Sequence, residues 1–320
     1  MGIIDKVRGF LWGAEEDLSE QGEGGGEDVA TAGYGDKAAQ GSAGTPADAK
    51  KEGASGAQDM PPLEGTGKAM PSCTDPYPNE EQYLIWRSET CPACSKGYKI
   101  LSPRSGKVRR LQSEKDLRPV CEGIDILKYN LHFCPECGYS RLSIGGTPNG
   151  MSSWQRAALE EQPNESIDQE ILQEMFDPDR TGKWAYGSSI LLHKASLEQS
   201  ITLKLTAGEV AYNHLVLAWL YRAMEDAGIE AEDRTFVAEN AQHHYEEAFH
   251  GMQRALSNEY CPICGMDEAT VRLLIAAMAV KLGERGTASQ IISGILLERR
   301  TPEKIKDRAR DLKADLSKQM

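Results

Sequence analysis

The sequence predicts a mostly α-helical protein that carries one small β zinc ribbon. Three observations lead to this fold class. Cys-Pro-x-Cys pairs lie close together in the first half of the chain, apolar residues recur at helical spacing from residue 152 onward, and the first 75 residues hold few large apolar side chains. We therefore expect a zinc ribbon over residues 83–145 and tetratricopeptide-like antiparallel helix pairs over residues 152–320.

The N-terminal region should not join this core. Residues 14–75 consist mainly of Gly, Ala, Ser, Asp and Glu, so they bury too little apolar surface to offset the entropy of ordering, and we predict disorder. Residues 1–13 differ because apolar side chains recur there at helical spacing. They predict a short amphipathic helix whose residues 2–12 contact a membrane weakly or fit a partner groove. The apolar residues are Ile3, Ile4, Val7, Phe10 and Leu11.

Composition excludes several classes of protein. The formal net charge of −13 argues against a chain that coats nucleic acid along its whole length. The longest apolar run, near Leu273 to Val280, is too short to span a bilayer and predicts a buried helix. We find no hydrophobic region leading to a signal-peptide cleavage site. Because the cysteines are clustered in pairs rather than scattered, we expect metal binding in a reducing compartment, the cytoplasm.

Four cysteines form the predicted metal site. Cys-x-x-Cys lets two sulfurs reach one ion across a tight turn, and two such knuckles complete a tetrahedral Zn²⁺ site. The knuckles are Cys91 with Cys94 and Cys134 with Cys137, and the second is followed by Gly138, where the turn favours a positive φ. Four thiolates leave no open position on the metal, so we expect a structural zinc and no catalysis.

Helical spacing continues through the second half of the chain. We predict helices over about 188–205 and 208–227, the latter apolar on more than one face and hence packed between neighbours. Further apolar stripes run over 237–256, 271–282 and 288–295, with a Gly-containing turn from Gly283 to Gly286. Capping boxes are predicted at Ser152 with Gln155, at Ser166 with Gln169 and at Thr287 with Gln290, and Thr301-Pro302 predicts another helix start.

These motifs resemble the bacterial domain-of-unknown-function family 2225. The resemblance covers roughly residues 83–300 and implies a ribbon followed by tetratricopeptide-like helices, with no particular activity. Cys121, where the family more often has an aromatic residue, and the third cysteine pair depart from its pattern. The matching segments are Thr90–Cys94, Pro103–Arg109, Asp116, Glu122–Ile124, Tyr129, Phe133–Tyr139 and Leu217–Arg222.

The third pair, Cys261 and Cys264, leaves three readings open. It forms a second zinc site completed by His244, His250 or Cys73; it is a redox-active dithiol at the start of the next helix; or it only packs at a helix turn.

The histidines give no enzyme signature. His243, Glu247 and His250 share one helix face, which is more often solvated than metal-binding, and His214 reads as a core residue. No nucleotide-binding loop or hydrolase elbow is present. We therefore expect no catalytic residue, no cofactor except zinc and no small-molecule substrate.

Two functions of different class follow. The favoured one is a scaffold whose helical groove binds a protein partner, with Arg222, His243 and Arg272 as groove candidates. The alternative is nucleic-acid binding by the ribbon, where Lys and Arg exceed Asp and Glu by five between Arg87 and Arg141. A basic ribbon that docks on its own acidic helices explains the same charges. The basic residues are Arg104, Lys107, Arg109, Arg110, Lys115 and Arg118.

Overall fold

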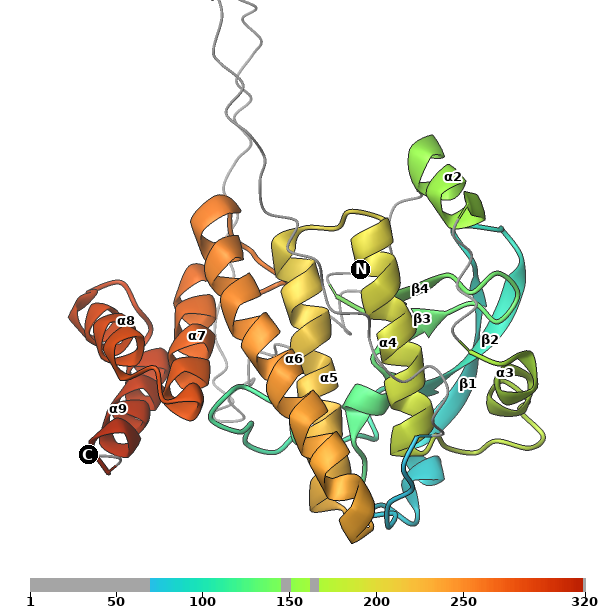
Figure 1. Ribbon diagram of the computed structural model, residues 1–320, viewed down its shortest axis with the longest axis horizontal. Coiled ribbons are helices and arrows are strands. Elements are labelled where there is room, and N and C mark those ends of the chain that lie inside the picture. The colour runs from blue at the N-terminus through green and yellow to red at the C-terminus, as the bar shows by residue number, and fades with distance from the viewer. Residues whose placement is uncertain (1–69, 145–150, 162–166, 319–320) are drawn as a thin grey trace, which may run out of the picture. The chain divides into compact units, whose positions relative to one another are not determined.

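The computed structural model describes residues 70–144, 151–161 and 167–318. The helix predicted for residues 1–13 and nearly all of the predicted disordered segment lie outside these ranges. The described part is mostly helical and carries two small antiparallel strand pairs, which confirms the fold class (Figure 1). No helix in the described ranges combines the length and apolar character that crossing a bilayer requires.

Each strand pair is a hairpin that holds one cysteine knuckle in its loop. The first hairpin pairs β1 (Leu84–Thr90) with β2 (Gly97–Pro103), and the register brings Thr90 opposite Gly97. The second pairs β3 (Leu131–Phe133) with β4 (Ser140–Leu142). Short 3-10 helices η1 (Glu80–Tyr83) and η2 (Ile126–Tyr129) precede β1 and β3. Residues 104–130 connect the hairpins and are called the insert below.

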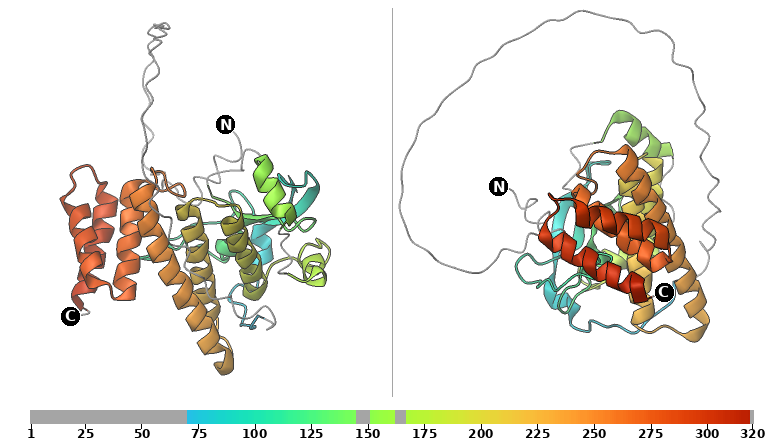
Figure 2. Two further views of the ribbon diagram at one scale, coloured as in Figure 1. Left: turned by 45° about the horizontal axis from the view of Figure 1, so that its top comes forward. Right: turned by 90° about the vertical axis from the view of Figure 1, so that its left-hand side faces the viewer.

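Eight α-helices follow in the described residues. Two are short and flank the ribbon, and the other six pack in chain order, with α4 on α5, α5 on α6, α6 on α7, and α8 and α9 on α7. In Figure 2 the later helices, coloured orange to red, lie on the side away from the hairpins. The helices are α2 (Ser153–Glu161), α3 (Gln169–Met175), α4 (Tyr186–Thr202), α5 (Ala207–Asp226), α6 (Ala231–Asn258), α7 (Glu268–Leu282), α8 (Arg285–Leu297) and α9 (Glu303–Lys318).

These helices lie where the apolar spacing predicted them. The run from Leu273 to Val280 is fully buried in α7, since helices pack on both sides of it. Gly283 ends α7 with a φ of +77°, a left-handed conformation that favours glycine. Whether the helix pairs are tetratricopeptide repeats stays a prediction.

Of the three predicted capping boxes, one is confirmed, one lies partly outside the described residues and one is wrong. The Ser152 box is present, with the backbone N–H of Gln155 donating to the Ser152 hydroxyl at 3.3 Å. Ser166 lies outside the described residues, and α3 is instead capped by Asp168. The Thr287 box is wrong, because α8 already begins at Arg285 and Thr287 lies inside it. A complete box at Thr206 with Glu209 starts α5 and was missed, although its Thr-x-x-Glu pattern is visible in the sequence.

The buried carboxylate of Asp116 is one of the groups that bind the insert to the helices. Asp116, 5 % exposed, accepts hydrogen bonds from Trp219 Nε1 at 3.1 Å, the Arg222 guanidinium at 2.7 Å and the Tyr245 hydroxyl at 3.2 Å. Arg308 of α9 donates to the Ser113 hydroxyl of the same turn at 3.0 Å. The insert therefore covers part of α5, α6 and α9 with its own polar groups.

Candidate metal centre

Both knuckles have the same backbone geometry. In the first, Cys91 O accepts from Ser95 N at 2.9 Å and Cys91 N donates to Lys96 O at 2.9 Å. In the second, Cys134 O accepts from Gly138 N at 2.9 Å and Cys134 N donates to Tyr139 O at 2.8 Å. The residue after each second cysteine has positive φ, +71° at Gly138 and +61° at Ser95. Ser95 thus adopts the conformation for which glycine was expected.

The two knuckles bring four sulfurs together. Cys91 Sγ lies 3.6 Å from Cys137 Sγ, Cys94 Sγ lies 3.8 Å from Cys134 Sγ, and all four lie within 4.8 Å of one another. No disulfide links them. A tetrahedral zinc with Zn–S bonds of about 2.3 Å separates its sulfurs by about 3.8 Å. The spacing of these cysteines therefore fits a metal ion of this kind.

The pKa values of three of these thiols, Cys91, Cys134 and Cys137, also favour a metal ion at this site. Hydrogen bonds from the thiols of Cys134 and Cys137 lower the pKa of Cys91 to about 2. The thiol of Cys137 lowers the pKa of Cys134, but Cys91 and burial raise it, and it ends at about 12. The pKa of Cys137 also rises, because Cys134 and Cys91 oppose its ionisation. Cys91 therefore ionises readily, whereas the raised pKa values of Cys134 and Cys137 mean that these thiols lose their protons only beside a cation that balances the charge.

Helix α4 fixes the second knuckle from outside. The buried amide of Gln199 accepts from Ser140 N at 2.6 Å and donates to Gly138 O at 2.6 Å. One side chain therefore holds the backbone on both sides of Tyr139. The ion pair of Arg141 with Glu209 joins the following strand to α5. Sequence reasoning missed Gln199, and no local pattern marks it, because it lies about sixty residues from the knuckle.

Aromatic rings continue this support. Phe133 stacks on Phe176 with ring centroids 5.5 Å apart, Phe176 contacts Trp184 at 5.7 Å, and Trp184 stacks on Tyr129 at 5.3 Å. The second hairpin is thus packed against the segment between α3 and α4.

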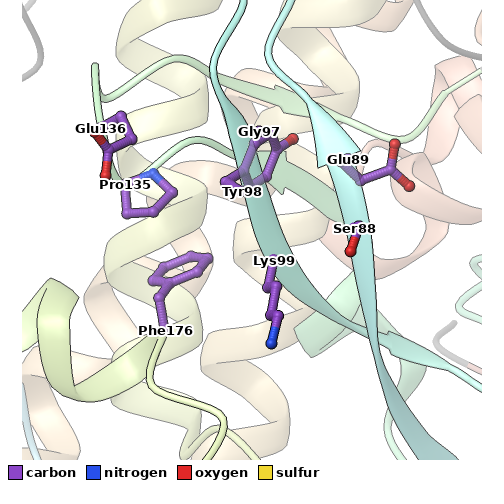
Figure 3. A pocket seen from close by; sticks show the side chains of 8 residues that line it. All are labelled: Ser88, Glu89, Gly97, Tyr98, Lys99, Pro135, Glu136 and Phe176. Atoms are coloured by element: carbon purple, nitrogen blue, oxygen red, sulfur yellow. The ribbon is translucent and has the colours of Figure 1, made fainter.

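A pocket of about 440 Å³ adjoins the metal knuckles (Figure 3). Pro135, Glu136 and Phe176 lie on one side, and the β1–β2 hairpin with Tyr98 and Lys99 lies on the other. Pro135 and Glu136 are the residues between the two cysteines of the second knuckle. Ser88 and Glu89 of β1 and Gly97 at the start of β2 complete the lining, and Ser88 lies opposite Lys99 in the strand register.

The third cysteine pair has a different local structure. Ile263 and Met266 exchange backbone hydrogen bonds of 3.0 and 2.9 Å across Cys264 and Gly265, both with positive φ. This is a two-residue hairpin turn rather than a knuckle. Cys264 is buried while Cys261 is exposed. Burial raises the pKa of both thiols, which works against a reactive thiolate.

The other ligands proposed for this pair lie elsewhere. His244 is buried between α5 and α6, with its Nδ1 2.9 Å from Nδ1 of His214. His250 is exposed on α6, and Cys73 forms an isolated bridge with Ile229. Among the described residues, only the four ribbon cysteines form a group of three or more metal-ligating atoms. A second metal site therefore stays a prediction without a third ligand in the described part, and His214 is the core histidine we expected.

At least five of the six basic residues of the ribbon contact other groups of the same chain. Arg104 Nε donates to Leu84 O at 2.6 Å, Lys107 lies over the Tyr83 ring, and Arg109 pairs with Glu122. Arg118 pairs with Glu114 and with the buried Asp125, and Lys115 pairs with Asp315 of α9. These side chains are used within the chain.

Of the three groove candidates, two are held by ion pairs. Arg222 pairs with Asp116 and Glu114 of the insert, so it binds the chain's own segment. Arg272 pairs with Glu268 and Glu298. His243 is half-buried on α6 beside His244. Arg222 therefore belongs to the folded core rather than to an open groove.

Comparison with known proteins gives one match. No curated protein and no solved structure matches the chain. Residues 84–316 match the model of a bacterial family described as "Uncharacterized protein conserved in bacteria (DUF2225)". This span contains both knuckles, the insert and most of the helices up to α9, which agrees with the resemblance seen in the sequence. The chain therefore belongs to the DUF2225 family of bacteria.

Proposed function

We propose that this protein is a scaffold that binds a protein partner through its helices, held together by one structural Zn²⁺ and without catalysis. The observation that carries the proposal is the closed set of four sulfurs. A zinc with four thiolate ligands has no position left for water or substrate, so its contribution is to folding. Zinc is the metal we propose because four thiolates in tetrahedral spacing suit it.

The position of the site supports a scaffold. The ribbon joins β1–β2 to β3–β4, and Gln199 and Glu209 connect the second hairpin and its strand to α4 and α5. The metal thereby fixes the base on which the later helices pack. A rigid base with successive helices presents extended surface for a partner.

Nucleic-acid binding is the weaker alternative. Arg104, Lys107 and Arg109 contact their own chain, and the whole protein is acidic. We expect that replacing all three with Ser leaves partner binding unchanged. Binding to DNA or RNA that falls steeply with salt and disappears in this variant would favour the alternative over the scaffold.

Metal analysis and partner capture test the proposal together. Protein purified without chelators should contain one zinc per chain, and Cys134→Ser should lose it while the helices persist. Cys121→Ser is the matched control, because Cys121 is buried in the insert away from the four sulfurs. Structural zinc contributes on the order of 10 kcal/mol to a small module. Protein without zinc would contradict the metal proposal.

The partner is sought by affinity purification of the intact protein from bacterial cells. Leu217→Ala should lose stability and the partner together, since Leu217 is fully buried in α5. Repeated purification with no specific partner, from folded and zinc-loaded protein, would contradict the scaffold.

A further inference from the structure

A second pocket, of about 530 Å³, lies where the first described residues pack on the start of α4. Its lining comes from residues 70–76, η2, α3 and the chain from 183 to 191, and it is mostly apolar. A pocket of this size and character is typical of sites that bind apolar groups. We call it the entry pocket. Its larger apolar side chains are those of Met70, Pro71, Ile171, Trp184, Tyr186 and Leu191.

The charged side chains of the lining are already paired within the chain. They are Asp75, Lys128 and Lys183. Lys183 pairs with Asp75, and the buried Lys128 pairs with the equally buried Glu80. These groups therefore need no opposite charge from an occupant, and an apolar occupant fits the entry pocket better than an ion does.

Part of the apolar lining stays in contact with water. Ile171 is 41 % exposed on α3, and Met70 and Leu191 are only partly buried. Removing apolar surface from water is favourable in proportion to its area. An apolar side chain that entered the pocket would gain this stabilisation from its own surface and from that of the lining.

The chain that precedes the described part is joined to it beside the entry pocket. Met70 is the first described residue, and a Cβ atom on Gly187 would lie 3.0 Å from Met70 Cβ and 3.5 Å from Pro71 O. Gly187 thus lets this segment pack closely on the first turn of α4. Cys73 then forms a β-bridge with Ile229, which holds the segment further along. Residues 1–69 are therefore attached at the rim of the pocket.

One apolar segment is tethered to this point. Residues 3–11 place large apolar side chains on one face of the predicted helix. The composition of residues 14–69 predicts a flexible linker, whose root-mean-square span is about 40 Å. A linker of this kind gives the segment a local concentration on the order of millimolar at the entry pocket. The apolar side chains are those of Ile3, Ile4, Val7, Phe10 and Leu11.

We propose that residues 2–12 of this chain dock their apolar face in the entry pocket. The local concentration makes a weak contact sufficient, because a Kd on the order of 0.1 mM would fill the pocket about 90 % of the time. This inference goes beyond the scaffold function, since it does not depend on which partner the helices bind.

A lipid surface and the pocket of a second copy are the other places for the same apolar face. The segment carries only Lys6 and Arg8 against Asp5, so anionic lipid attracts it weakly. A second copy would have to reach a millimolar concentration to compete with the tethered segment. Docking within one chain is therefore favoured over both.

Alkylation of Cys73 measures the occupancy, because Cys73 lines the entry pocket and is only half-buried. The zinc-loaded full chain and a variant lacking residues 2–12 are treated briefly with N-ethylmaleimide, and each modified cysteine is identified by mass spectrometry. We expect Cys73 to react about tenfold faster in the deletion variant, which is the ratio of the local concentration to the Kd. The exposed Cys261 is the internal control and should react equally in both proteins.

Variants of the segment distinguish apolar docking from a general effect of the deletion. Ile4→Ser/Phe10→Ser should accelerate the reaction of Cys73 as the deletion does. Asp5→Ser/Lys6→Ser changes polar positions of the same segment and should leave the rate as it is. A peptide of residues 1–13 added to the deletion variant should restore protection, with a half-maximal effect on the order of 0.1 mM.

A variant of the lining tests the pocket itself. Ile171→Glu places a charge in the entry pocket, so it should accelerate the reaction of Cys73 in the full chain and add nothing in the deletion variant. Ile201→Glu is the matched control, because Ile201 is 42 % exposed on α4 outside the lining and should change nothing.

Three results would overturn the inference. The first is an equal rate at Cys73 in the full chain and the deletion variant. The second is protection of Cys73 that grows with protein concentration, which would place a second copy in the pocket. The third is binding to anionic vesicles that requires residues 2–12 while the rate at Cys73 ignores the deletion, which would assign the segment to a lipid surface.

Discussion

Replacing Asp116 with Ala should be among the most damaging changes outside the metal site. The carboxylate is buried in the insert and accepts hydrogen bonds from Trp219 and Arg222 of α5 and from Tyr245 of α6. Burial alone would raise the pKa of Asp116, but the charge and hydrogen bond of Arg222 hold it below the ordinary value. The ionised carboxylate is therefore the form that joins the insert to the helices.

The expected loss follows from these three bonds. A neutral hydrogen bond contributes about 1 kcal/mol and a bond to a charged group about 1.5–3 kcal/mol. Because the Asp116 carboxylate is ionised, all three bonds go to a charged group and together give about 4.5–9 kcal/mol. Arg222 keeps its ion pair with Glu114, so the cation is not left alone. With a urea m-value on the order of 2–3 kcal/mol per M, the midpoint should fall by about 1.5–4.5 M.

Urea unfolding of the zinc-loaded protein, followed by tryptophan fluorescence, measures this shift. Glu122→Ala is the matched control, because it removes another insert carboxylate whose pair with Arg109 is exposed on both sides. An exposed pair of this kind contributes about 1 kcal/mol or less. If the midpoint of Asp116→Ala fell no further than that of Glu122→Ala, the buried carboxylate would not hold the insert, and this reasoning would be refuted.

Three further predictions concern the site and the core. Gln199→Leu should release zinc to a chelator faster than the parent protein, because the second knuckle loses both backbone contacts, while Gln242→Leu on the exposed face of α6 should release it at the parent rate. The zinc content of Cys261→Ser should equal that of the parent, at one ion per chain, and a fall from two ions to one would reveal the second site. Burial lowers the pKa of His193 to about 4, so folding stability should be complete above about pH 6.5 and fall as the pH drops toward 4. His193→Asn should flatten that part of the pH dependence, measured by urea unfolding at each pH, and an unchanged slope would show that another group titrates there.

Local patterns explain why the ribbon and the helices were predictable. A knuckle is determined by residues within a few positions of each other. The spacing Cys91-x-x-Cys94 and Cys134-x-x-Cys137 therefore predicts its geometry from the sequence. Buried α7 likewise reads as a continuous apolar run from Leu273 to Val280. The Thr287 box failed because Thr-x-x-Gln also occurs inside a helix, and the pattern alone does not fix where the helix begins.

The structure of the third cysteine pair and the role of Arg222 could not be predicted, because both depend on how segments pack in the folded chain. The third Cys-Pro-x-Cys pair shares its letters with the knuckles, yet positive φ at both Cys264 and Gly265 turns it into a tight hairpin with one thiol buried. From the sequence, Arg222 is a polar helix residue available to a partner. In the folded chain it pairs with Asp116 and Glu114 of the insert.

The sequence by itself thus determined the fold class, the four clustered cysteines and the course of the main helices, because each arises from spacing along a short stretch of chain. Only the tertiary structure decided that Gln199 holds the second knuckle, that Asp116 joins the insert to α5 and α6, and that Arg272 of α7 pairs with Glu298 just after α8. Each of these contacts joins residues that are far apart in the chain or lie on different elements, and such contacts form only after packing has brought the elements together.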